Sequence, residues 1–258
     1  MSPLRSATAL HVADTPSERF IGKVADFSVR TLFSARARKT AYGAGALPII
    51  PTDMSAQLIA ITGGSGSGKT WLAKKLKRQF GRRAGLLSLD DFYRDLSALP
   101  AKERDKVNFD HPDAIDWDLF LHCLKQIRRG EKTLLPRYDF CTHTRHARPR
   151  VWQPRPVVFI DGLWLLSQPK FRRVYAFSVY ADCAEEVRLA RRLARDQQDR
   201  GRSRASVLRQ WRSHVKPMHD QHVAPQVKVA RMVFNQDSTH ESLASLGQIV
   251  EKLILANE

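Results

Sequence analysis

Residues 63–70 combine the residue types and the spacing of a phosphate-binding loop, because Gly-Gly-Ser-Gly-Ser-Gly-Lys-Thr fits the pattern G-x-x-x-x-G-K-[ST]. Glycines let backbone N–H groups turn inward around phosphate oxygens, and the start of a following helix adds partial positive charge. We expect the Lys69 ammonium to reach the β- and γ-phosphates of a nucleotide and the Thr70 hydroxyl to bind Mg²⁺. The alternative is a Gly/Ser-rich turn between a strand and a helix. The predicted nucleotide-binding residues are Gly63, Gly64, Ser65, Gly66, Ser67, Gly68, Lys69 and Thr70.

Two carboxylates follow short apolar runs elsewhere in the chain. Residues 157–160 are apolar and end at Asp161, and the run 86–89 ends at Asp90. In a parallel sheet the carboxyl ends of the strands lie near the bound phosphates. We therefore predict a Mg²⁺ site formed by Thr70, Asp90 and Asp161. The alternative for Asp161 is a carboxylate that caps a turn.

The elements that must position these residues alternate along the chain from residue 57 onward. Such alternation predicts an α/β fold, a P-loop NTPase-type parallel sheet with helices on both faces. Residues 54–258 are expected to form this domain. Residues 1–53 lack sustained periodicity and are expected to be a poorly structured N-terminal extension or to precede a true start at Met54, with a targeting peptide as the alternative. The predicted strands are 57–62, 86–89, 157–160, 174–180 and 229–234, and the predicted helices are 70–80, 116–129, 185–195 and 241–256.

Four short blocks carry a resemblance to one family. Ser-Leu-Asp-Asp-Phe-Tyr at 88–93, Asn-Phe-Asp-His-Pro-Asp-Ala at 108–114, Pro-Arg-Tyr-Asp-Phe at 136–140 and Asp-Arg-Gly-Arg at 199–202 stand in the order and spacing of its signatures. Over roughly residues 56–235 the chain resembles the uridine/cytidine kinase family of the phosphoribulokinase/uridine kinase superfamily. The resemblance implies phosphorylation of the 5′-hydroxyl of a pyrimidine nucleoside in pyrimidine salvage, with ATP (or GTP) as donor and Mg²⁺ as cofactor. It also implies a small β-hairpin substrate lobe, an Arg-rich lid, a cytoplasmic enzyme and a homo-oligomer.

The resemblance assigns roles to individual side chains. Asp90 matches the carboxylate that accepts the proton of the 5′-hydroxyl, and Asp110 matches the carboxylate that grips the ribose hydroxyls. Two acceptor oxygens suit a vicinal diol. Tyr93 and Tyr138 resemble pocket residues, although either one alone is more often a core residue. His143 falls five residues after Tyr138, as in the base-recognition hairpin of the family.

Arginines recur through residues 188–202. Arg188, Arg191, Arg192 and Arg195 have i, i+3, i+4 and i+7 spacing, which places them on one helix face. A lid that closes over ATP phosphates would use such a face. The alternative is a solvated basic face paired with Asp182, Glu185, Glu186 or Asp199. The resemblance assigns functions to Arg192, Arg195, Arg200 and Arg202 and base contact to Gln210, so that the expected catalytic set is Lys69, Asp90, Arg195 and Arg200.

Composition limits the remaining choices. The net charge of +17 favours anionic partners, and no run of about 18 apolar residues predicts a membrane span. The three cysteines lack metal-site spacing and are expected to be reduced thiols. Asp161 stands where the family more often has Glu, Arg231 where Asp is typical, and residues 144–156 are unusually basic. A phosphoribulokinase- or pantothenate kinase-like enzyme, or a non-catalytic nucleotide-dependent RNA-binding or regulatory protein, therefore stays open.

Overall fold

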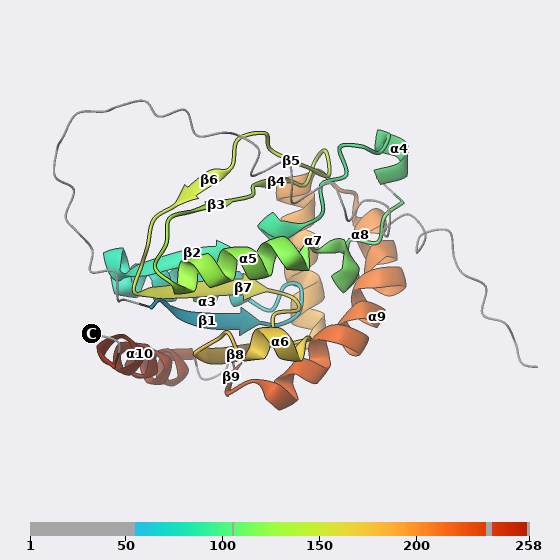
Figure 1. Ribbon diagram of the computed structural model, residues 1–258. Coiled ribbons are helices and arrows are strands. Elements are labelled where there is room, and N and C mark those ends of the chain that lie inside the picture. The colour runs from blue at the N-terminus through green and yellow to red at the C-terminus, as the bar shows by residue number, and fades with distance from the viewer. Residues whose placement is uncertain (1–54, 105, 236–238, 257–258) are drawn as a thin grey trace, which may run out of the picture.

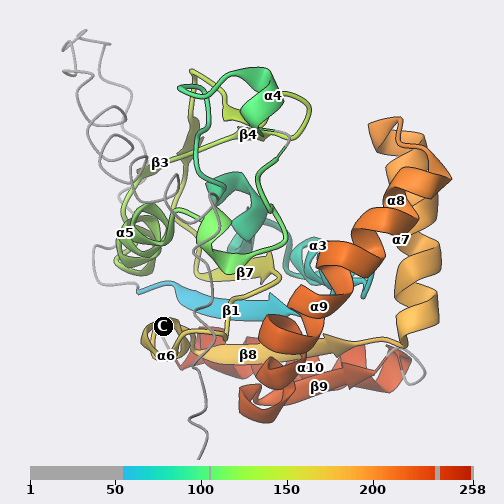
Figure 2. The ribbon, with the colours of Figure 1, turned by 90° about the vertical axis from the view of Figure 1, so that its right-hand side faces the viewer.

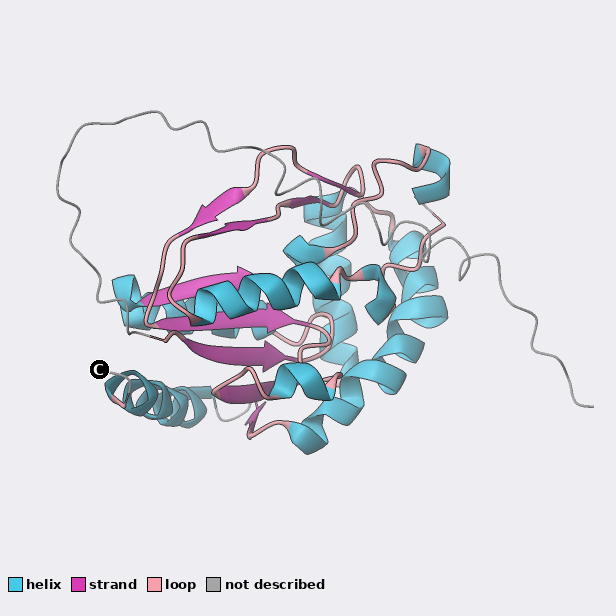
Figure 3. Ribbon diagram, in the orientation of Figure 1, coloured by secondary structure: helices cyan, strands magenta, loops and turns pink. Residues whose placement is uncertain are grey.

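The computed structural model describes residues 55–104, 106–235 and 239–256 (Figure 1). Its centre is a five-stranded sheet in the order β2-β7-β1-β8-β9, and every neighbouring pair is parallel. Helices cover the sheet on both sides (Figure 3). The predicted α/β class is thereby confirmed. The strands are β1 Gln57–Thr62, β2 Ala84–Ser88, β7 Val157–Gly162, β8 Phe177–Asp182 and β9 Met232–Asn235.

The register of the sheet brings three strand ends together. On β7, Asp161 lies beside Ile61 of β1 and beside Ser88 of β2. All six residues of β7 are buried, because helices cover both faces of this central strand. The residues that follow β1 and β2 therefore emerge on either side of Asp161. This is the edge at which the predicted phosphate and metal ligands must meet.

One hydrophobic cluster lies on each face of the sheet. On one face α3 (Lys69–Phe80) and α10 (Thr239–Leu255) pack against the strands through Leu72, Leu76, Leu246 and Val250. On the other face α5 (Trp117–Arg128) and α6 (Pro169–Arg172) contribute side chains that include Phe120, Leu124 and Phe171. The carboxylate of Asp116 begins α5 by accepting a hydrogen bond from the Leu119 N–H at 3.1 Å.

Two small antiparallel sheets form a separate lobe over the β2 side (Figure 1). One pairs β3 (Thr133–Leu135) with β6 (Arg150–Trp152), and the other pairs β4 (Tyr138–Asp139) with β5 (Thr144–Arg145). They form the predicted hairpin lobe. The short helices near it are η1 (Gly81–Arg83), η2 (Leu89–Phe92), α4 (Ala101–Arg104) and η3 (Pro112–Ala114).

A helical arm stands beside the carboxyl edge of the sheet. Helix α7 spans Glu185–Arg200 and ends at Gly201, whose φ is +60°. A second, irregular helical stretch turns back along it (Figure 2). It consists of α8 (Arg204–Gln210), the π-helical turns η4 (Trp211–Val215) and η5 (His219–Val223), α9 (Lys216–Met218) and η6 (Ala224–Val229).

Some predicted boundaries were wrong. The strand predicted to start at residue 174 starts at Phe177, because the Val174 N–H closes a turn onto the Phe171 carbonyl at 2.9 Å. The strand predicted over 229–234 is Met232–Asn235, since η6 occupies residues up to Val229. The helix predicted over 185–195 continues to Arg200. The helical stretch 204–229 was not predicted at all.

Three other sequence predictions concern the cysteines, membrane spans and the N-terminal segment. Among the described residues, Cys123, Cys141 and Cys183 form no disulfide. Within the described ranges, no helix is long and apolar enough to cross a membrane. The prediction for residues 1–53 lies outside the described residues.

Candidate active site

The phosphate-binding loop runs from the end of β1 into the start of α3. Gly66 and Gly68 have φ of +81° and +83°, a region that side chains with a Cβ rarely adopt. A Cβ on Gly66 would lie 2.3 Å from the Arg188 carbonyl oxygen, because α7 packs directly on the loop. The Ser67 N–H bonds the Gly64 carbonyl at 3.1 Å and closes the turn. The loop residues therefore hold a backbone shape that only glycine allows at these two positions.

Thr70 and Asp161 meet at the strand edge. The Thr70 hydroxyl donates a hydrogen bond of 2.5 Å to Oδ2 of Asp161, and the Asp161 side chain is buried. A hydroxyl and a carboxylate in contact are hard oxygen donors of the kind that Mg²⁺ takes, with water and phosphate oxygens completing its shell. These residues thus fit a magnesium ion held with a nucleotide.

Lys69 and Asp90 form a charged centre beside this pair. Burial lowers the pKa of Lys69, and the charges of Asp90 and Asp161 oppose that shift. Burial also raises the pKa of Asp90, with Lys69 opposing the shift and Asp161 adding to it. Arg195 and Arg200 act on Asp90 as further positive charges. An ammonium, two carboxylates and two lid arginines therefore share one electrostatic environment.

Aromatic side chains from the hairpin lobe, from the end of η2 and from the segment between α4 and η3 line the next part of the site. The Tyr93 hydroxyl donates to the Phe109 carbonyl at 3.0 Å, and the Tyr93 and Tyr138 rings lie 5.2 Å apart between centroids. The His143 ring stacks on Phe109 at 4.1 Å between centroids, with 13° between the ring planes. The φ of His143 is +56°, a left-handed backbone conformation within the hairpin turn that carries this ring. Phe140 adds another edge contact to Tyr93 at 6.1 Å.

Phe109 and Phe140 were not among the predicted site residues. Both lie inside the blocks at 108–114 and 136–140 that carry the family resemblance. Their place in those blocks was the available signal. Burial raises the pKa of the Tyr93 phenol, and the charges of Asp90 and Asp110 raise it further. Tyr93 therefore lies within the fields of Asp90, the predicted catalytic carboxylate, and of Asp110, the predicted ribose-binding carboxylate.

Asp110 is tied to the lid by an amide. Gln210 Nε2 donates to Oδ2 of Asp110 at 2.9 Å. The Gln210 carbonyl oxygen accepts from Arg192 Nη2 at 3.0 Å and also from Arg202 Nη1. Arg192 Nη1 in turn donates to the Ser65 hydroxyl at 2.9 Å. A continuous hydrogen-bonded chain thus joins the phosphate loop, the lid and Asp110.

A buried carboxylate on α7 holds the lid arginines together. The Asp196 side chain is fully buried, and an Asp196 oxygen lies 2.7 Å from Arg195 Nη2 and 3.4 Å from Arg192 Nε. Arg202 Nη1 and Arg200 Nε lie 3.6 and 3.9 Å from it. Asp196 was not among the predicted residues, although Arg192, Asp196 and Arg200 repeat at i, i+4 spacing.

The alternative of a solvated basic face on α7 was wrong for Arg188 and Arg192. Both are buried, and Arg192 pairs with Asp196 at 3.4 Å and with Asp110 at 3.9 Å, neither of which is among the four acidic residues named in that alternative. The Arg188 Nε donates to the Cys183 carbonyl at 3.1 Å, and its guanidinium lies over the Trp211 ring at 5.5 Å. Arg191 is exposed, so the arginines do not form a single uniform face.

The lid also touches the hairpin lobe. The Arg200 guanidinium lies over the Phe140 ring at 5.2 Å from its centroid. A cation over an aromatic face gains electrostatic attraction. The end of α7 and the hairpin lobe therefore meet across the site.

Two of the unusual basic residues, Arg145 and Arg231, make structural contacts outside this pocket. Arg145 and Asp116 form a buried ion pair at 3.2 Å, and Arg145 Nε donates to the Tyr93 carbonyl at 3.0 Å. Arg145 thus supports the backbone beneath Tyr93. Arg231 donates to the Ala176 carbonyl at 2.9 Å, next to β8. Neither residue supplies a free cation for an acceptor.

The fold and the site together define a P-loop phosphotransferase. The model of the "Phosphoribulokinase / Uridine kinase family" matches residues 58–242. The chain therefore belongs to this family. It is 36% identical over 185 residues to the uridine kinase of Staphylococcus haemolyticus (strain JCSC1435), a match that covers 71% of this chain and 89% of the relative.

A second relative is also a uridine kinase, and one solved structure shares the fold. The chain is 39% identical over 178 residues to the uridine kinase of Chloroflexus aurantiacus (strain ATCC 29366 / DSM 635 / J-10-fl), covering 69% of this chain and 85% of the relative. The phosphoribulokinase of Rhodobacter spheroides superposes with a TM-score of 0.54 at 14% identity and 70% coverage of each chain. The solved structure supports the fold alone.

Proposed function

We propose that this protein transfers the γ-phosphate of ATP to the 5′-hydroxyl of a pyrimidine nucleoside, uridine or cytidine, with Mg²⁺. The observation that carries the proposal is the placement of Tyr93 within the fields of Asp90 and Asp110, between the phosphate loop and an aromatic hairpin. The charge of Lys69 from the phosphate loop acts on Asp90, and Gln210 of the lid donates a hydrogen bond to Asp110. The names of the two relatives support the same acceptor class.

The loop and the strand edge would bind the donor. Backbone N–H groups of residues 63–68 and the Lys69 ammonium would neutralise the triphosphate. Thr70 and Asp161, with Asp90 nearby, would hold Mg²⁺. The ion, when bound, supplies charge neutralisation at the phosphates. Arg195 and Arg200 would add positive charge where the transferred group becomes more negative.

Asp90 would receive the proton of the attacking hydroxyl. Its raised pKa makes the ionised carboxylate a better base than a free aspartate. In a loose transition state little proton transfer is needed before the phosphorus–oxygen bond forms, so that orientation of the hydroxyl contributes most. We therefore assign to Asp90 both the orientation of the 5′-hydroxyl and the acceptance of its proton.

Asp110 and the aromatic residues would bind the nucleoside. The carboxylate of Asp110 can accept from the 2′- and 3′-hydroxyls, with Gln210 repositioning from its bond to Asp110 toward the base. Tyr93, Tyr138 and His143 would contact the sugar and the pyrimidine ring. Arg192 and Arg202 would couple nucleoside binding to lid closure, because both bond Gln210.

A phosphorylated acceptor would need free cations on the acceptor side. Two of the arginines that suggested such an acceptor are engaged elsewhere, because Arg145 pairs with Asp116 and Arg231 donates to the Ala176 carbonyl. This supports the nucleoside over ribulose 5-phosphate. A homo-oligomer and a cytoplasmic location are further proposals that rest on the family resemblance.

An acceptor panel tests the proposal. ADP release would be measured with ATP and Mg²⁺ and with uridine, cytidine, adenosine, ribulose 5-phosphate, pantothenate or no acceptor. We expect turnover on uridine or cytidine. Turnover confined to another acceptor would refute the nucleoside assignment, and nucleotide binding without any turnover would favour a regulatory or RNA-binding role.

A further inference from the structure

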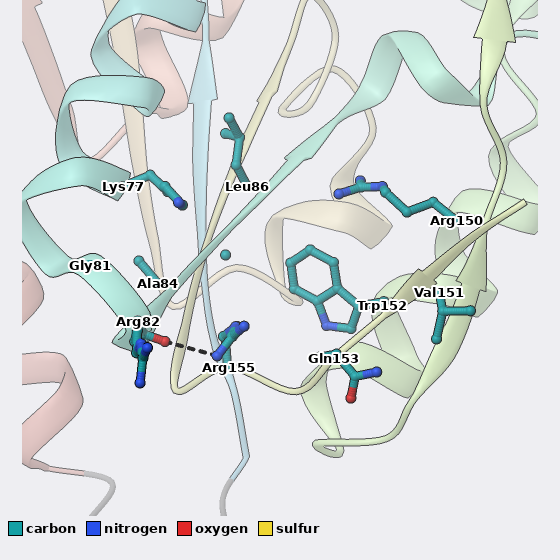
Figure 4. A pocket seen from close by; sticks show the side chains of 11 residues that line it. Lys77, Gly81, Arg82, Ala84, Leu86, Arg150, Val151, Trp152, Gln153 and Arg155 are labelled. Atoms are coloured by element: carbon teal, nitrogen blue, oxygen red, sulfur yellow. Dashed lines mark hydrogen bonds between the residues drawn. The ribbon is translucent and has the colours of Figure 1, made fainter.

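A second cavity lies at the other end of β2, away from the active site. It has a volume of about 450 Å³ and is bounded by the start of β2, the end of α3 and the segment from β6 onward (Figure 4). Strand β2 pairs only with β7 among the described strands, so its second edge faces this space. The residues that line the cavity include none of those placed in the active site.

The cavity is strongly cationic. Its lining contains Lys77, Arg82, Arg150 and Arg155 but no carboxylate, and none of the four forms an ion pair with another described residue. In Figure 4 the Lys77 ammonium and the Arg150 guanidinium point toward one another from opposite sides of the space. Like charges that face one another repel unless an anion lies between them.

Two of these cations are held in place by other groups. Arg155 Nη1 donates to the Arg82 carbonyl at 3.1 Å, which ties the segment after β6 to η1, directly after α3. The Arg150 guanidinium lies 5.9 Å from the centre of the Trp152 ring. Asp91 lies outside the cavity lining. Burial raises the pKa of Asp91, and the charge of Arg150 partly opposes that shift. Arg155 and Arg150 are therefore each positioned at the cavity by a contact with another residue.

An apolar wall completes the cavity. Trp152 is buried, and its ring lies so close to β2 that a Cβ on Gly85 would be 2.2 Å from Cη2. Leu86 and Val151 add further apolar surface. Small-molecule sites commonly have volumes of about 300–1,000 Å³ and combine apolar walls with a few polar groups. The size of this cavity fits a small molecule better than a folded partner.

We propose that this cavity binds a small phosphorylated ligand. The phosphate lies between Lys77 and Arg150, and the rest of the ligand lies against the Trp152 wall. Charge-assisted bonds from guanidinium and ammonium groups are those that proteins use for phosphate. The proposal does not depend on the proposed function, because the two sites share no residues.

Binding should be measured where the phosphate loop is weakened by loss of its lysine. Inorganic pyrophosphate, UMP and UTP would be titrated by calorimetry into the Lys69→Ala protein. We expect one equivalent of at least one probe to bind to this protein. Lys77→Gln or Arg150→Gln, added singly, should weaken that binding about tenfold, the usual effect of losing one charge-assisted bond.

Arg78→Gln is the matched control, because Arg78 is exposed on α3 next to Lys77 and lies outside the cavity. Its variant should bind the probes normally, and melting curves should show that all variants fold. Equal binding of pyrophosphate and the nucleotides would identify phosphate as the recognised group. Tighter binding of the nucleotides would show that the Trp152 wall also contributes to binding. No binding of any probe, or equal weakening by Arg78→Gln, would overturn the proposal.

Discussion

Replacing Asp196 by asparagine should loosen the lid without changing any residue that contacts a substrate. The carboxylate is fully buried and lies within 4 Å of four arginine side chains, those of residues 192, 195, 200 and 202. Asparagine keeps the shape of the side chain but removes its negative charge. The arginines that close on the phosphates would then repel one another, with Arg192 buried among them.

The size of the effect follows from the burial of each pair. Breaking a buried ion pair by removing one partner costs about 3–5 kcal/mol. Arg192 keeps its bonds to Ser65 and Gln210, so we expect the lower end of that range. The side chains of the other three arginines are 29–38% exposed, and such screened pairs contribute about 0–1 kcal/mol each. A total of about 3 kcal/mol would lower the melting temperature by about 6–12 °C.

Activity should fall along with stability. A displacement of about 1 Å in positioning groups can cost about a hundredfold in rate, so we expect kcat to fall about ten- to a hundredfold. Asp199→Asn is the control, because Asp199 is exposed on the same helix and forms no ion pair with another described residue, while the charge change is identical. Steady-state kinetics and thermal melting of both variants would be compared. If Asp196→Asn behaved like Asp199→Asn, the reasoning about the lid would be refuted.

Three further changes test other parts of the structure. Thr70→Val removes the hydroxyl bonded to Asp161 and should raise the Mg²⁺ concentration needed for half-maximal activity at least about tenfold; an unchanged Mg²⁺ titration would contradict this site. Burial beside Arg188 lowers the pKa of His219 to about 4, below its unfolded value of about 6.5, so stability should be lost as the pH falls from 6.5 to 4. His219→Gln should remove about 2 kcal/mol of that loss, as measured by urea unfolding at several pH values, and an unchanged pH dependence would contradict the assignment. The buried Gln226 amide bonds Thr62, Leu163, Leu166 and His222, so Gln226→Leu should cost about 3 kcal/mol of unfolding free energy, whereas exposed Gln221→Leu should cost almost nothing.

Elements with clear local signals could be predicted from the sequence. The apolar run 57–62 is bounded by the glycine loop and matches β1 at both ends. Helix α5 begins with its Asp116 cap and ends just before Gly130, so local chemistry sets both of its limits. The stretch 204–229 escaped prediction because Pro217 and Pro225 argue against a helix. The four-residue spacing of Val207, Trp211 and Val215, all buried, was the signal that could have revealed it.

The candidate site divides in the same way. The loop, Asp90 and Asp161 were predictable because each stands next to a recognisable strand. Asp196 was missed because its importance comes from arginines on both sides of a turn that the sequence does not place in space. The contact of Arg200 with Phe140 joins segments 60 residues apart, and only the tertiary fold brings them together.

The contribution of Asp90 to phosphoryl transfer is the central claim of this account. Radiolabelled γ-phosphate of ATP would be followed into uridine, with the product separated as the 5′-monophosphate, for the wild-type protein and Asp90→Asn. The account predicts label on the 5′-position in the wild type and a rate reduced about a hundredfold or more in Asp90→Asn, with ATP still bound. Label that appears elsewhere than on the nucleoside, or an Asp90→Asn protein that transfers phosphate at the wild-type rate, would contradict it.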